Sequence, residues 1–246
     1  MDTPPPERPL IPACPRCGSF RVTRAGVTPN QVPSFRCPDC GRRFVAHPRK
    51  GPVTDERKEL ILRLLAERLS LRAIARVTGV SRSWLQAFVN TVYQDETPWE
   101  PGPVNTQEGE IVVEADELWS YVGNKREPWW IWVALNARTR QVVGMAAGDR
   151  SEQTAQCLWD ALPQAYRDRA IVATDFHAPY RAVIPEDRHA AAGKDAGLTA
   201  HIERFWCTLR QRCGRLVRKT LSFSKKWENH IGALWYFIRL YNKSRS

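Results

Sequence analysis

The chain has 246 residues, of which 43% are hydrophobic, and its 37 Lys and Arg against 26 Asp and Glu give a formal net charge of +11. This length and hydrophobic content exclude a fully disordered chain and suggest one to two globular domains with small appendages. A charge so far from zero indicates a polyanionic partner, with nucleic acid first and an acidic membrane surface second. A merely soluble basic protein is the simpler alternative.

The charge is unevenly distributed along the chain. Residues 1–54 hold nine Arg and Lys against three acids, residues 105–200 hold ten against fourteen, and residues 201–246 hold eleven against two. Basic ends around a mildly acidic middle are expected of a DNA-binding enzyme with a carboxylate site. The chain begins without a signal-peptide pattern, and its longest apolar run is too short to span a bilayer. We therefore expect a cytoplasmic, nucleoid-associated protein with no membrane partner.

Residues 1–11 are Pro-rich, and we expect them to be disordered. Two C-x-x-C pairs follow, in C-P-R-C-G-S and C-P-D-C-G-R-R-F. Each pair directs two thiolates at one ion, and the following glycine permits the backbone turn. In a reducing compartment this pattern indicates one structural zinc ion, with a redox pair as the alternative. The apolar residues between the pairs predict a zinc ribbon at 12–46. Its expected zinc ligands are Cys14, Cys17, Cys37 and Cys40, and its expected DNA contacts are Arg42 and Arg43.

Residues 54–94 have helical periodicity and include the run L-R-A-I-A-R-V-T-G-V-S-R-S-W-L-Q-A-F. Gly79 supplies a turn in this run, and Ser81 is a good N-cap for the helix that follows. This spacing predicts a helix-turn-helix domain that binds double-stranded DNA, with an ordinary helical hairpin as the alternative. The start of the second helix would face base edges in the major groove, through Arg82, Ser83 and Gln86.

A linker with three prolines is expected at 95–109, before an α/β domain at 110–246. The pattern predicts strands at 111–118, 129–136 and 141–147, a helix at 151–166, a strand at 170–174, mixed structure at 176–198, and helices at 199–218 and 226–241. This succession suits a mixed α/β sheet of the ribonuclease-H type flanked by helices, although the order alone does not single out that fold.

Acidic residues stand at the ends of these predicted elements. The strand I-V-V-E-A-D-E-L-W-S-Y carries Glu114, Asp116 and Glu117, and strand alternation leaves Glu114 and Asp116 as candidates on one face. Asp175 follows a later strand, and Glu203 begins a basic helix. Two Mg²⁺ or Mn²⁺ ions held by such oxygens can stabilise both the attacking and the leaving oxygen of a phosphodiester displacement. A salt bridge, an N-cap and an ion pair within a helix are the structural alternatives for Asp116, Asp175 and Glu203, respectively.

The helix that begins near Glu203 is expected to combine an acid with a DNA-binding surface. Arg210 lies two turns after Glu203 on the same face. Phe205 and Trp206 are expected to pack in the core rather than to stack on bases. The cations expected to contact the DNA backbone are Arg212, Arg215, Arg218 and Lys219.

Eight motifs follow one another between about residues 12 and 242: C-P-R-C-G-S, C-P-D-C-G-R-R-F, R-A-I-A-R-V-T-G-V-S, D-E-L-W-S-Y-V-G, G-D-R-S, T-D-F-H-A-P-Y, H-I-E-R-F-W-C-T-L-R and R-K-T-L-S-F-S-K. This order resembles the transposases of the family typified by bacterial insertion sequence one. The resemblance implies an Asp-Asp-Glu transposase with a ribonuclease-H-like catalytic domain. Asp116, Asp175 and Glu203 would then be its metal-binding triad, and Arg210 would match the supporting basic residue that follows the glutamate by seven positions in many such enzymes. Phe205 and Trp206 replace asparagines of some relatives, which argues against a polar role at these positions.

The leading hypothesis is therefore a magnesium-dependent transposase that binds terminal inverted repeats, cleaves at the ends of the element and joins the freed 3′ hydroxyl to target DNA. Bringing two DNA ends together implies at least a dimer in the active complex. A non-catalytic DNA-binding regulator and a structure-specific nuclease on the same fold are the alternatives. Glu114 and Glu117 are expected to be supporting residues whose loss matters less than that of Asp116.

Overall fold

The structure is a computed structural model that describes residues 11–46, 52–95, 110–191, 193, 197–216 and 223–245. The chain divides into two compact units, residues 1–54 and residues 55–246. The disorder predicted at 1–11 and the linker predicted at 95–109 lie almost wholly outside the described residues, so both stay predictions.

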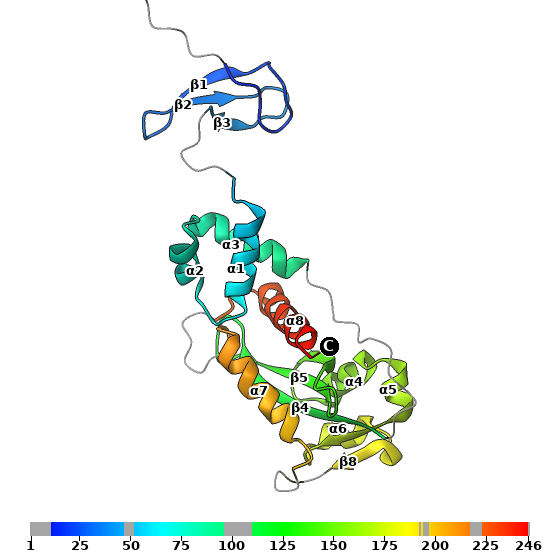
Figure 1. Cartoon of the computed structure of the whole chain (residues 1–246). Coiled ribbons are helices and arrows are strands. Elements are labelled where there is room, and N and C mark those ends of the chain that lie inside the picture. Colours follow the sequence, from blue (N-terminus) through cyan, green and yellow to red (C-terminus); the bar gives the residue numbers. More distant parts are fainter. Residues whose placement is uncertain are drawn as a thin grey trace, which may run out of the picture. The chain divides into compact units, whose positions relative to one another are not determined.

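The first unit contains a three-stranded antiparallel sheet in the order β1-β2-β3 (Figure 1). The strands are β1 (Thr23–Val27), β2 (Pro33–Arg36) and β3 (Arg43–Val45). Its buried hydrophobic cluster consists of only Cys14, Val22, Phe35 and Cys37. Because two of these four residues are cysteines of the C-x-x-C pairs, apolar burial alone offers this unit little stability.

The second unit begins with α1 (Asp55–Leu65), α2 (Leu71–Thr78) and α3 (Arg82–Gln94), as the helical periodicity predicts. Ser70 caps α2 by accepting the N–H of Ala73 at 3.2 Å. Gly79 ends α2 with φ 71°, a left-handed conformation that favours glycine. Ser81 then caps α3 by accepting the N–H of Trp84 at 3.3 Å, so α3 starts at Arg82, three residues after Gly79.

A five-stranded mixed sheet in the order β6-β5-β4-β7-β8 forms the centre of the second unit. Strands β4, β5 and β6 are antiparallel neighbours, whereas β7 and β8 run parallel to β4. The strands are β4 (Ile111–Tyr121), β5 (Pro128–Asn136), β6 (Val142–Gly148), β7 (Ala170–Thr174) and β8 (His189–Ala191). Strand β5, which lies between β6 and β4, is buried from Ile131 to Asn136, as expected of a strand covered on both faces.

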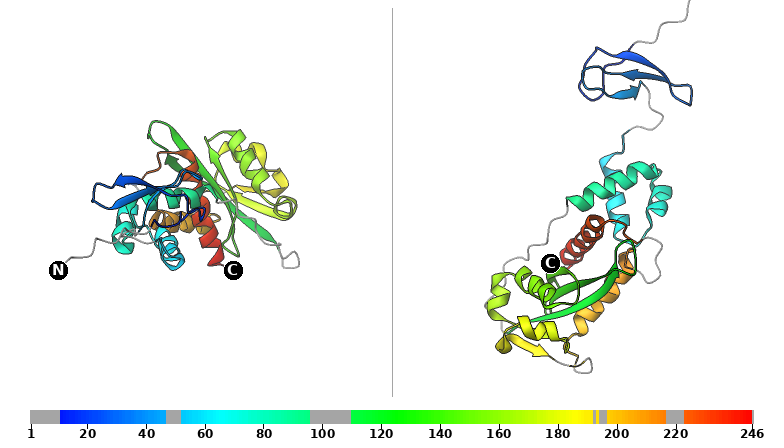
Figure 2. Two further views of the ribbon diagram at one scale, coloured as in Figure 1. Left: turned by 90° about the horizontal axis from the view of Figure 1, so that it is seen from above. Right: turned by 180° about the vertical axis from the view of Figure 1, so that it is seen from behind.

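Helices cover both faces of this sheet (Figure 1, Figure 2). Residues of α7 and α8 share one hydrophobic cluster with the sheet, and residues of α4, α5 and α6 share the other. The helices are α4 (Glu152–Ala161), α5 (Gln164–Arg169), α6 (Ala178–Val183), the short 3-10 helix η1 (Glu186–Arg188), α7 (Ala200–Arg212) and α8 (Trp227–Lys243). Among the described residues, no helix is both long enough and apolar enough to cross a membrane.

The element boundaries differ from the predicted ones in three places. The first long strand runs on to Tyr121, because it forms a hairpin with β5 as far as Pro128. The helix predicted at 151–166 is two helices, since Pro163 lacks the N–H that would continue α4. The helix predicted at 199–218 ends at Arg212, and residues 217–222 lie outside the described part of the chain.

Helices α1 to α3 pack directly on the sheet domain rather than forming a compact unit of their own. Tyr236 of α8 donates its hydroxyl to the carbonyl of Leu62 at 2.6 Å. Arg212, at the end of α7, donates to the carbonyl of Ala66 at 3.2 Å and to the carboxylate of Glu67 at 2.7 Å. The α3 and α8 helices lie side by side in both views of the unit (Figure 1, Figure 2). The three helices and the sheet therefore form one body.

Close contact between α3 and α8 depends on Gly232. A Cβ atom at Gly232 would lie 2.2 Å from the carbonyl oxygen of Tyr93 and 2.7 Å from its Cβ. We expect Gly232→Ala to lower the free energy of unfolding by about 3 kcal/mol, because two helix backbones must separate. Gly214→Ala is the matched control, since its Cβ would meet only the carbonyl oxygen of Arg68 at 3.5 Å. Urea unfolding of both variants measures the difference, and equal stabilities would contradict this account of the packing.

A buried histidine links α8 to β4. His230 is 1% exposed, and its ring nitrogens lie 3.0 Å from Ser120 Oγ and 3.1 Å from Ser224 Oγ. Desolvation, with the charge of Arg215 adding to it, lowers the pKa of His230 to about 4. The folded protein therefore keeps this ring neutral at pH values where an unfolded chain already takes up the proton.

Stability should consequently fall as the pH falls from about 6.5 to about 4. Below about pH 4 both states bind the proton, so this contribution stops changing. The total effect of this one group is about 3 kcal/mol. His230→Gln keeps hydrogen-bonding groups but does not titrate. Urea unfolding of both proteins between pH 4 and pH 7 should show the steeper acid loss in the wild type, and parallel curves would refute the assignment.

Candidate functional site

The candidate site lies where β7 leaves the sheet. The β4–β7 pairing ends at Glu114 opposite Ala173, and β7 itself ends at Thr174. Asp175 is therefore level with Asp116 on the neighbouring strand. Oxygen atoms of Asp116, Glu117 and Asp175 all lie within 4.8 Å of one another. The structure thus brings two of the three predicted catalytic acids together, with Glu117 as their third neighbour.

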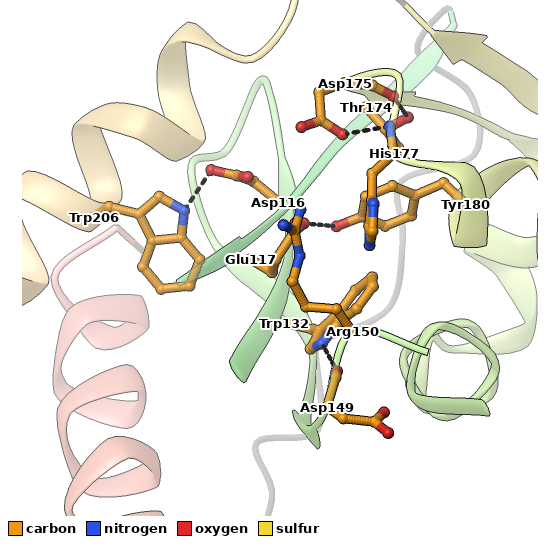
Figure 3. Close-up of polar contacts among 10 residues, drawn as sticks. All are labelled: Asp116, Glu117, Trp132, Asp149, Arg150, Thr174, Asp175, His177, Tyr180 and Trp206. Atoms are coloured by element: carbon orange, nitrogen blue, oxygen red, sulfur yellow. Dashed lines mark hydrogen bonds and ion pairs between the residues drawn. The ribbon is translucent and has the colours of Figure 1, made fainter. Parts of the chain in front are cut away.

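Asp116 is held from the α7 side of the sheet. The indole N–H of Trp206 donates to Asp116 Oδ2 at 2.8 Å, and Figure 3 shows Trp206 reaching this carboxylate from its helix. Desolvation raises the pKa of Asp116 to about 6, and the charges of Glu117 and Asp175 contribute in the same direction. The negative charge of this cluster is therefore electrostatically unfavourable without a cation.

Glu117 is held from the opposite side. Arg150 forms an ion pair with its Oε1, and the hydroxyl of Tyr180 donates to its Oε2 at 3.0 Å. Burial raises the pKa of Tyr180 well above its usual value, so the phenol remains a donor. The Glu117 side chain is only 3% exposed. With both oxygens engaged, Glu117 is fixed in place and partly neutralised.

Asp175 is fixed by its own turn. Its Oδ1 accepts the backbone N–H of His177 at 2.9 Å, at the start of α6 (Figure 3). The His177 ring lies among aromatic neighbours, with centroid distances of 5.8 Å to Trp132 and 6.1 Å to Tyr180. This is a local turn rather than the helix cap considered as an alternative, since the N-cap of α6 is His177, and an oxygen of Asp175 belongs to the acid cluster.

Glu203 is not part of the described acid cluster, and it lies on the exposed side of α7. It is nevertheless one helical turn before Trp206, whose side chain contacts Asp116. The start of α7 is attached to β4 by Glu114, which accepts the backbone N–H groups of His201 at 2.9 Å and Ile202 at 2.8 Å. Glu114 is 2% exposed, and desolvation raises its pKa. This acid therefore positions the helix that carries Glu203.

The residues present fit divalent ions. Carboxylate oxygens are the ligands that Mg²⁺ prefers, at about 2.1 Å from the ion, and they must gather from several elements to form such a site. The acid cluster meets this requirement with oxygens from β4 and from the turn after β7. A cation there would also offset the desolvation and the repulsion from Glu117 and Asp175 that raise the pKa of Asp116.

The four N-terminal cysteines also gather, with their sulfur atoms all within 4.8 Å of one another. The sulfurs of Cys14 and Cys40 are 3.6 Å apart, as are those of Cys17 and Cys37. Tetrahedral zinc with bonds of about 2.3 Å places its sulfurs about 3.8 Å apart, so this cluster fits one zinc ion. Both knuckles end on a glycine with positive φ, 71° at Gly18 and 70° at Gly41, as the pattern predicts.

The predicted DNA contacts are distributed over several elements. Arg82, Ser83 and Gln86 are exposed on the first two turns of α3. Arg43 instead bonds within the first unit, to Ser34 Oγ at 3.2 Å and to the carbonyl of Ala25, while Arg42 is exposed.

Two further predicted contacts have structural partners. Arg212 joins α7 to α1, and Arg215 donates to Ser224 Oγ at 2.9 Å with its guanidinium over the Tyr93 ring. Arg210 is half-buried on α7. Arg218 and Lys219 lie outside the described residues, so their role stays a prediction.

Sequence reasoning missed the residues that hold the acids. The expectation that Trp206 packs in the core is confirmed, but the argument against a polar role is wrong, because its indole nitrogen reaches Asp116. Arg150 and Tyr180 lie within the motifs G-D-R-S and T-D-F-H-A-P-Y. Their spacing in the sequence does not predict that both contact Glu117. A tryptophan can bury its ring and still donate one hydrogen bond, so composition cannot separate the two roles.

The fold and the site together define a protein with an α/β unit that holds a three-carboxylate cluster where β7 ends, and a separate unit with a four-cysteine cluster. Residues 110–242 match the family model described as IS1 transposase. The chain therefore belongs to the IS1 transposase family.

Relatives of known name agree with this assignment. The chain is 35% identical over 128 residues to the insertion element iso-IS1n protein InsB of Shigella dysenteriae, covering 52% of this chain and 94% of that protein. It is 32% identical over 130 residues to the insertion element IS1 4 protein InsB of Escherichia coli strain K12, covering 53% of this chain and 75% of that protein.

One solved structure, of a simian T-cell lymphotropic virus intasome in complex with PP2A regulatory subunit B56 gamma, aligns at 12% identity and a TM-score of 0.29. The alignment spans 59% of this chain and 56% of that chain. A TM-score of this size does not define the fold.

Proposed function

We propose that this chain is a metal-dependent DNA transposase that binds the terminal inverted repeats of an insertion sequence, cleaves at its ends and transfers the cut strand to target DNA. The observation that carries the proposal is the convergence of Asp116 and Asp175 within the segment that matches the family. The succession of three antiparallel strands, a helical segment and two parallel strands supports a ribonuclease-H-like catalytic domain.

In this proposal Asp116, Asp175 and Glu203 hold two Mg²⁺ or Mn²⁺ ions. Such ions, when bound, supply activation of water or of a 3′ hydroxyl and stabilisation of the leaving oxygen. Trp206 keeps the Asp116 carboxylate oriented, and the His177 amide does the same for Asp175. These contacts reduce the reorganisation that the site must undergo before each in-line displacement.

Glu203 completes the triad from α7 in this proposal. It lies in the first turn of α7, one turn before Trp206, on the same helix that contacts Asp116. Glu117 is the less suitable third ligand, because Arg150 and Tyr180 already occupy both of its oxygens. Arg210 lies on the same face of α7 as Glu203 and contributes a cation that attracts the DNA phosphates.

The remaining parts serve DNA binding. The four-cysteine unit holds one structural zinc ion and presents Arg42 to DNA, with Arg43 bracing the unit. Helices α2 and α3 act as a helix-turn-helix, with Arg82, Ser83 and Gln86 toward base edges. Because two ends must be joined to one target, the active complex contains at least two copies of the chain. The site of action is the nucleoid in the cytoplasm.

A strand-transfer assay tests this function. The full chain, a duplex that carries one end of the element, a target plasmid and Mg²⁺ or Mn²⁺ should yield joined product, and omission of the metal should abolish it. A DNA-binding regulator predicts end binding without metal-dependent cleavage by the full chain. A structure-specific nuclease predicts nicked DNA without joined product. Either of these results would replace the proposal.

A further inference from the structure

The second unit has a groove of about 910 Å³ between α1 to α3 on one side and α7 to α8 on the other. Its lining includes the predicted base-reading residues Arg82 and Gln86. It also includes Lys225 and Lys226, which precede α8 and belong to the sheet domain. The groove therefore joins the helix-turn-helix segment and the domain that carries the acid cluster in one concave surface.

The lining of the groove is strongly basic. Five of its cations are exposed, and no acidic residue is among the described residues that line it. Two more arginines, Arg212 and Arg215, line it while bracing the helices. The exposed cations are Arg68, Arg72, Arg82, Lys225 and Lys226. Cations gathered in this way repel one another unless a polyanion lies between them.

Two helices that line this groove, α2 and α3, have a cation and no acid in their first turn, whereas α8 follows Lys226 and has Glu228 in its first turn. Arg72 lies in the first turn of α2, Arg82 begins α3, and Lys226 is the N-cap of α8. The helix macrodipole favours acids at these positions and disfavours cations. By contrast α1 and α4, whose N-termini do not line the groove, begin with Asp55 and Glu152. The cations at the starts of α2 and α3 are therefore unfavourable for the helices alone, and a bound phosphate group would offset their cost.

The α3 wall offers groups that read bases. Arg82 and Gln86 are one turn apart on an exposed helix face, and Gln86 Nε2 donates to Asn90 Oδ1 at 2.8 Å, which fixes the amide. Asn90 also lines the groove. Arginine pairs with guanine and glutamine with adenine through two hydrogen bonds in the major groove. One wall therefore suits base edges of duplex DNA, and the α8 wall suits its phosphates.

A chain of aromatic contacts leads from the groove toward the acid cluster. Phe223 lines the groove, and its ring centroid lies 5.5 Å from that of Tyr121. Tyr121 lies 5.5 Å from Trp119, which is 42% exposed and two residues beyond Glu117 on β4. Helix α7 makes a second connection, since it runs from Trp206 at the acids to Arg212 at the groove, roughly 9 Å along its axis.

We infer that this groove is a composite site for duplex DNA, in which α3 reads the sequence and the cations before α8 hold the backbone of the same stretch. The inference rests on the proposed function for the identity of the DNA, the end of the element. The separation of Trp206 and Arg212 along α7, roughly 9 Å, is shorter than one duplex turn of about 35 Å, so one bound duplex could reach both the groove and the acids. Recognition and chemistry then act on neighbouring base pairs of one bound end.

Binding measurements on the full chain test the phosphate wall. Lys225→Ala/Lys226→Ala is compared with Arg169→Ala, an exposed cation on α5 at the opposite face of the sheet. The probe is duplex DNA carrying the element's end, titrated at several salt concentrations. The double variant should lower affinity at least about tenfold and reduce the slope of log K against log salt by about 2. The control should bind as the wild type does.

A second pair of variants tests the base-reading wall. Arg82→Ala and Gln86→Ala should each reduce discrimination between the end duplex and a scrambled duplex roughly tenfold. The lysine variant should weaken both duplexes equally, because phosphate contacts carry no sequence information. Thermal unfolding of each variant near the wild-type midpoint shows that the fold is retained.

Three outcomes decide the matter. Wild-type affinity and salt slope in the lysine variant would overturn the composite site, even if metal-dependent cleavage proceeds as proposed. Equal binding of a single strand of the same length would overturn the duplex assignment. Loss of end binding in the groove variants, in a chain that cleaves nothing with metal, would support the groove and reject the proposed function instead.

Discussion

Asp116→Asn should lower the rates of metal-dependent cleavage and joining by about a thousandfold or more, while the protein remains folded and binds DNA. Asparagine matches the shape of aspartate, and its carbonyl oxygen can still accept the N–H of Trp206. It lacks the negative charge that a divalent ion requires, so the transition state loses about 4 kcal/mol of stabilisation. The comparison uses equal protein concentrations in the strand-transfer assay.

The same assay orders the neighbouring acids. Asp175→Asn and Glu203→Gln should match Asp116→Asn, whereas Glu117→Gln and Glu114→Gln should keep measurable joining. Glu117 loses an ion pair with Arg150 but retains a hydrogen-bonding amide toward Tyr180. Glu114→Gln can still accept from the N–H groups that begin α7. These two variants therefore disturb the position of the ligands and not the ligands themselves.

The order of activities among these variants also identifies which acid is the third metal ligand beside Asp116 and Asp175. Glu117 lies within the described cluster, whereas Glu203 reaches it only if its side chain turns toward Asp116. Loss of joining in Glu117→Gln, together with wild-type joining in Glu203→Gln, would transfer the role to Glu117. Wild-type joining in Asp116→Asn would reject the whole assignment. DNA binding and thermal unfolding of each variant separate these results from misfolding.

Much of the site could be predicted because two of its acids follow runs of apolar β-formers. Apolar β-formers lead directly to Asp116, and a second short run leads to Asp175, so the sequence alone indicates a shared sheet edge. Strand parity places Glu117 on the opposite face from Asp116. It nevertheless joins the cluster, because β7 ends beside Glu114 and leaves the edge of β4 open. Where a neighbouring strand stops, alternation no longer separates the two side chains.

The sequence pattern could not predict contacts between elements that lie far apart in the chain. The helix-turn-helix spacing predicts α2 and α3 but not their attachment to α8, because the contact depends on a missing side chain at Gly232. The cations after Glu203 predict DNA binding in general. Only the packing shows that Arg212 and Arg215 brace helices while Lys225 and Lys226 remain exposed. The sequence shows which side chains are basic, but it does not show which groups they contact.

Removal of zinc should unfold residues 12–46 and leave residues 55–245 folded. The first unit has four fully buried hydrophobic residues, and two of them, Cys14 and Cys37, are expected ligands. Without the ion this small cluster cannot offset the entropy of ordering the chain, since a structural zinc contributes about 10 kcal/mol or more in domains of this kind. The second unit has its own two cores and needs no metal to fold.

Cys37→Ser tests this against Cys157→Ser, which alters an exposed cysteine on α4 outside the cluster. The first variant should lose bound zinc and become sensitive to protease within residues 12–46, while its main thermal transition stays near that of the wild type. The second should keep one zinc ion per chain. A folded, protease-resistant first unit without zinc, with its thiols freely reactive, would contradict the zinc ribbon. Since the two units are separate, loss of the ribbon should weaken DNA binding without removing metal-dependent chemistry at Asp116 and Asp175.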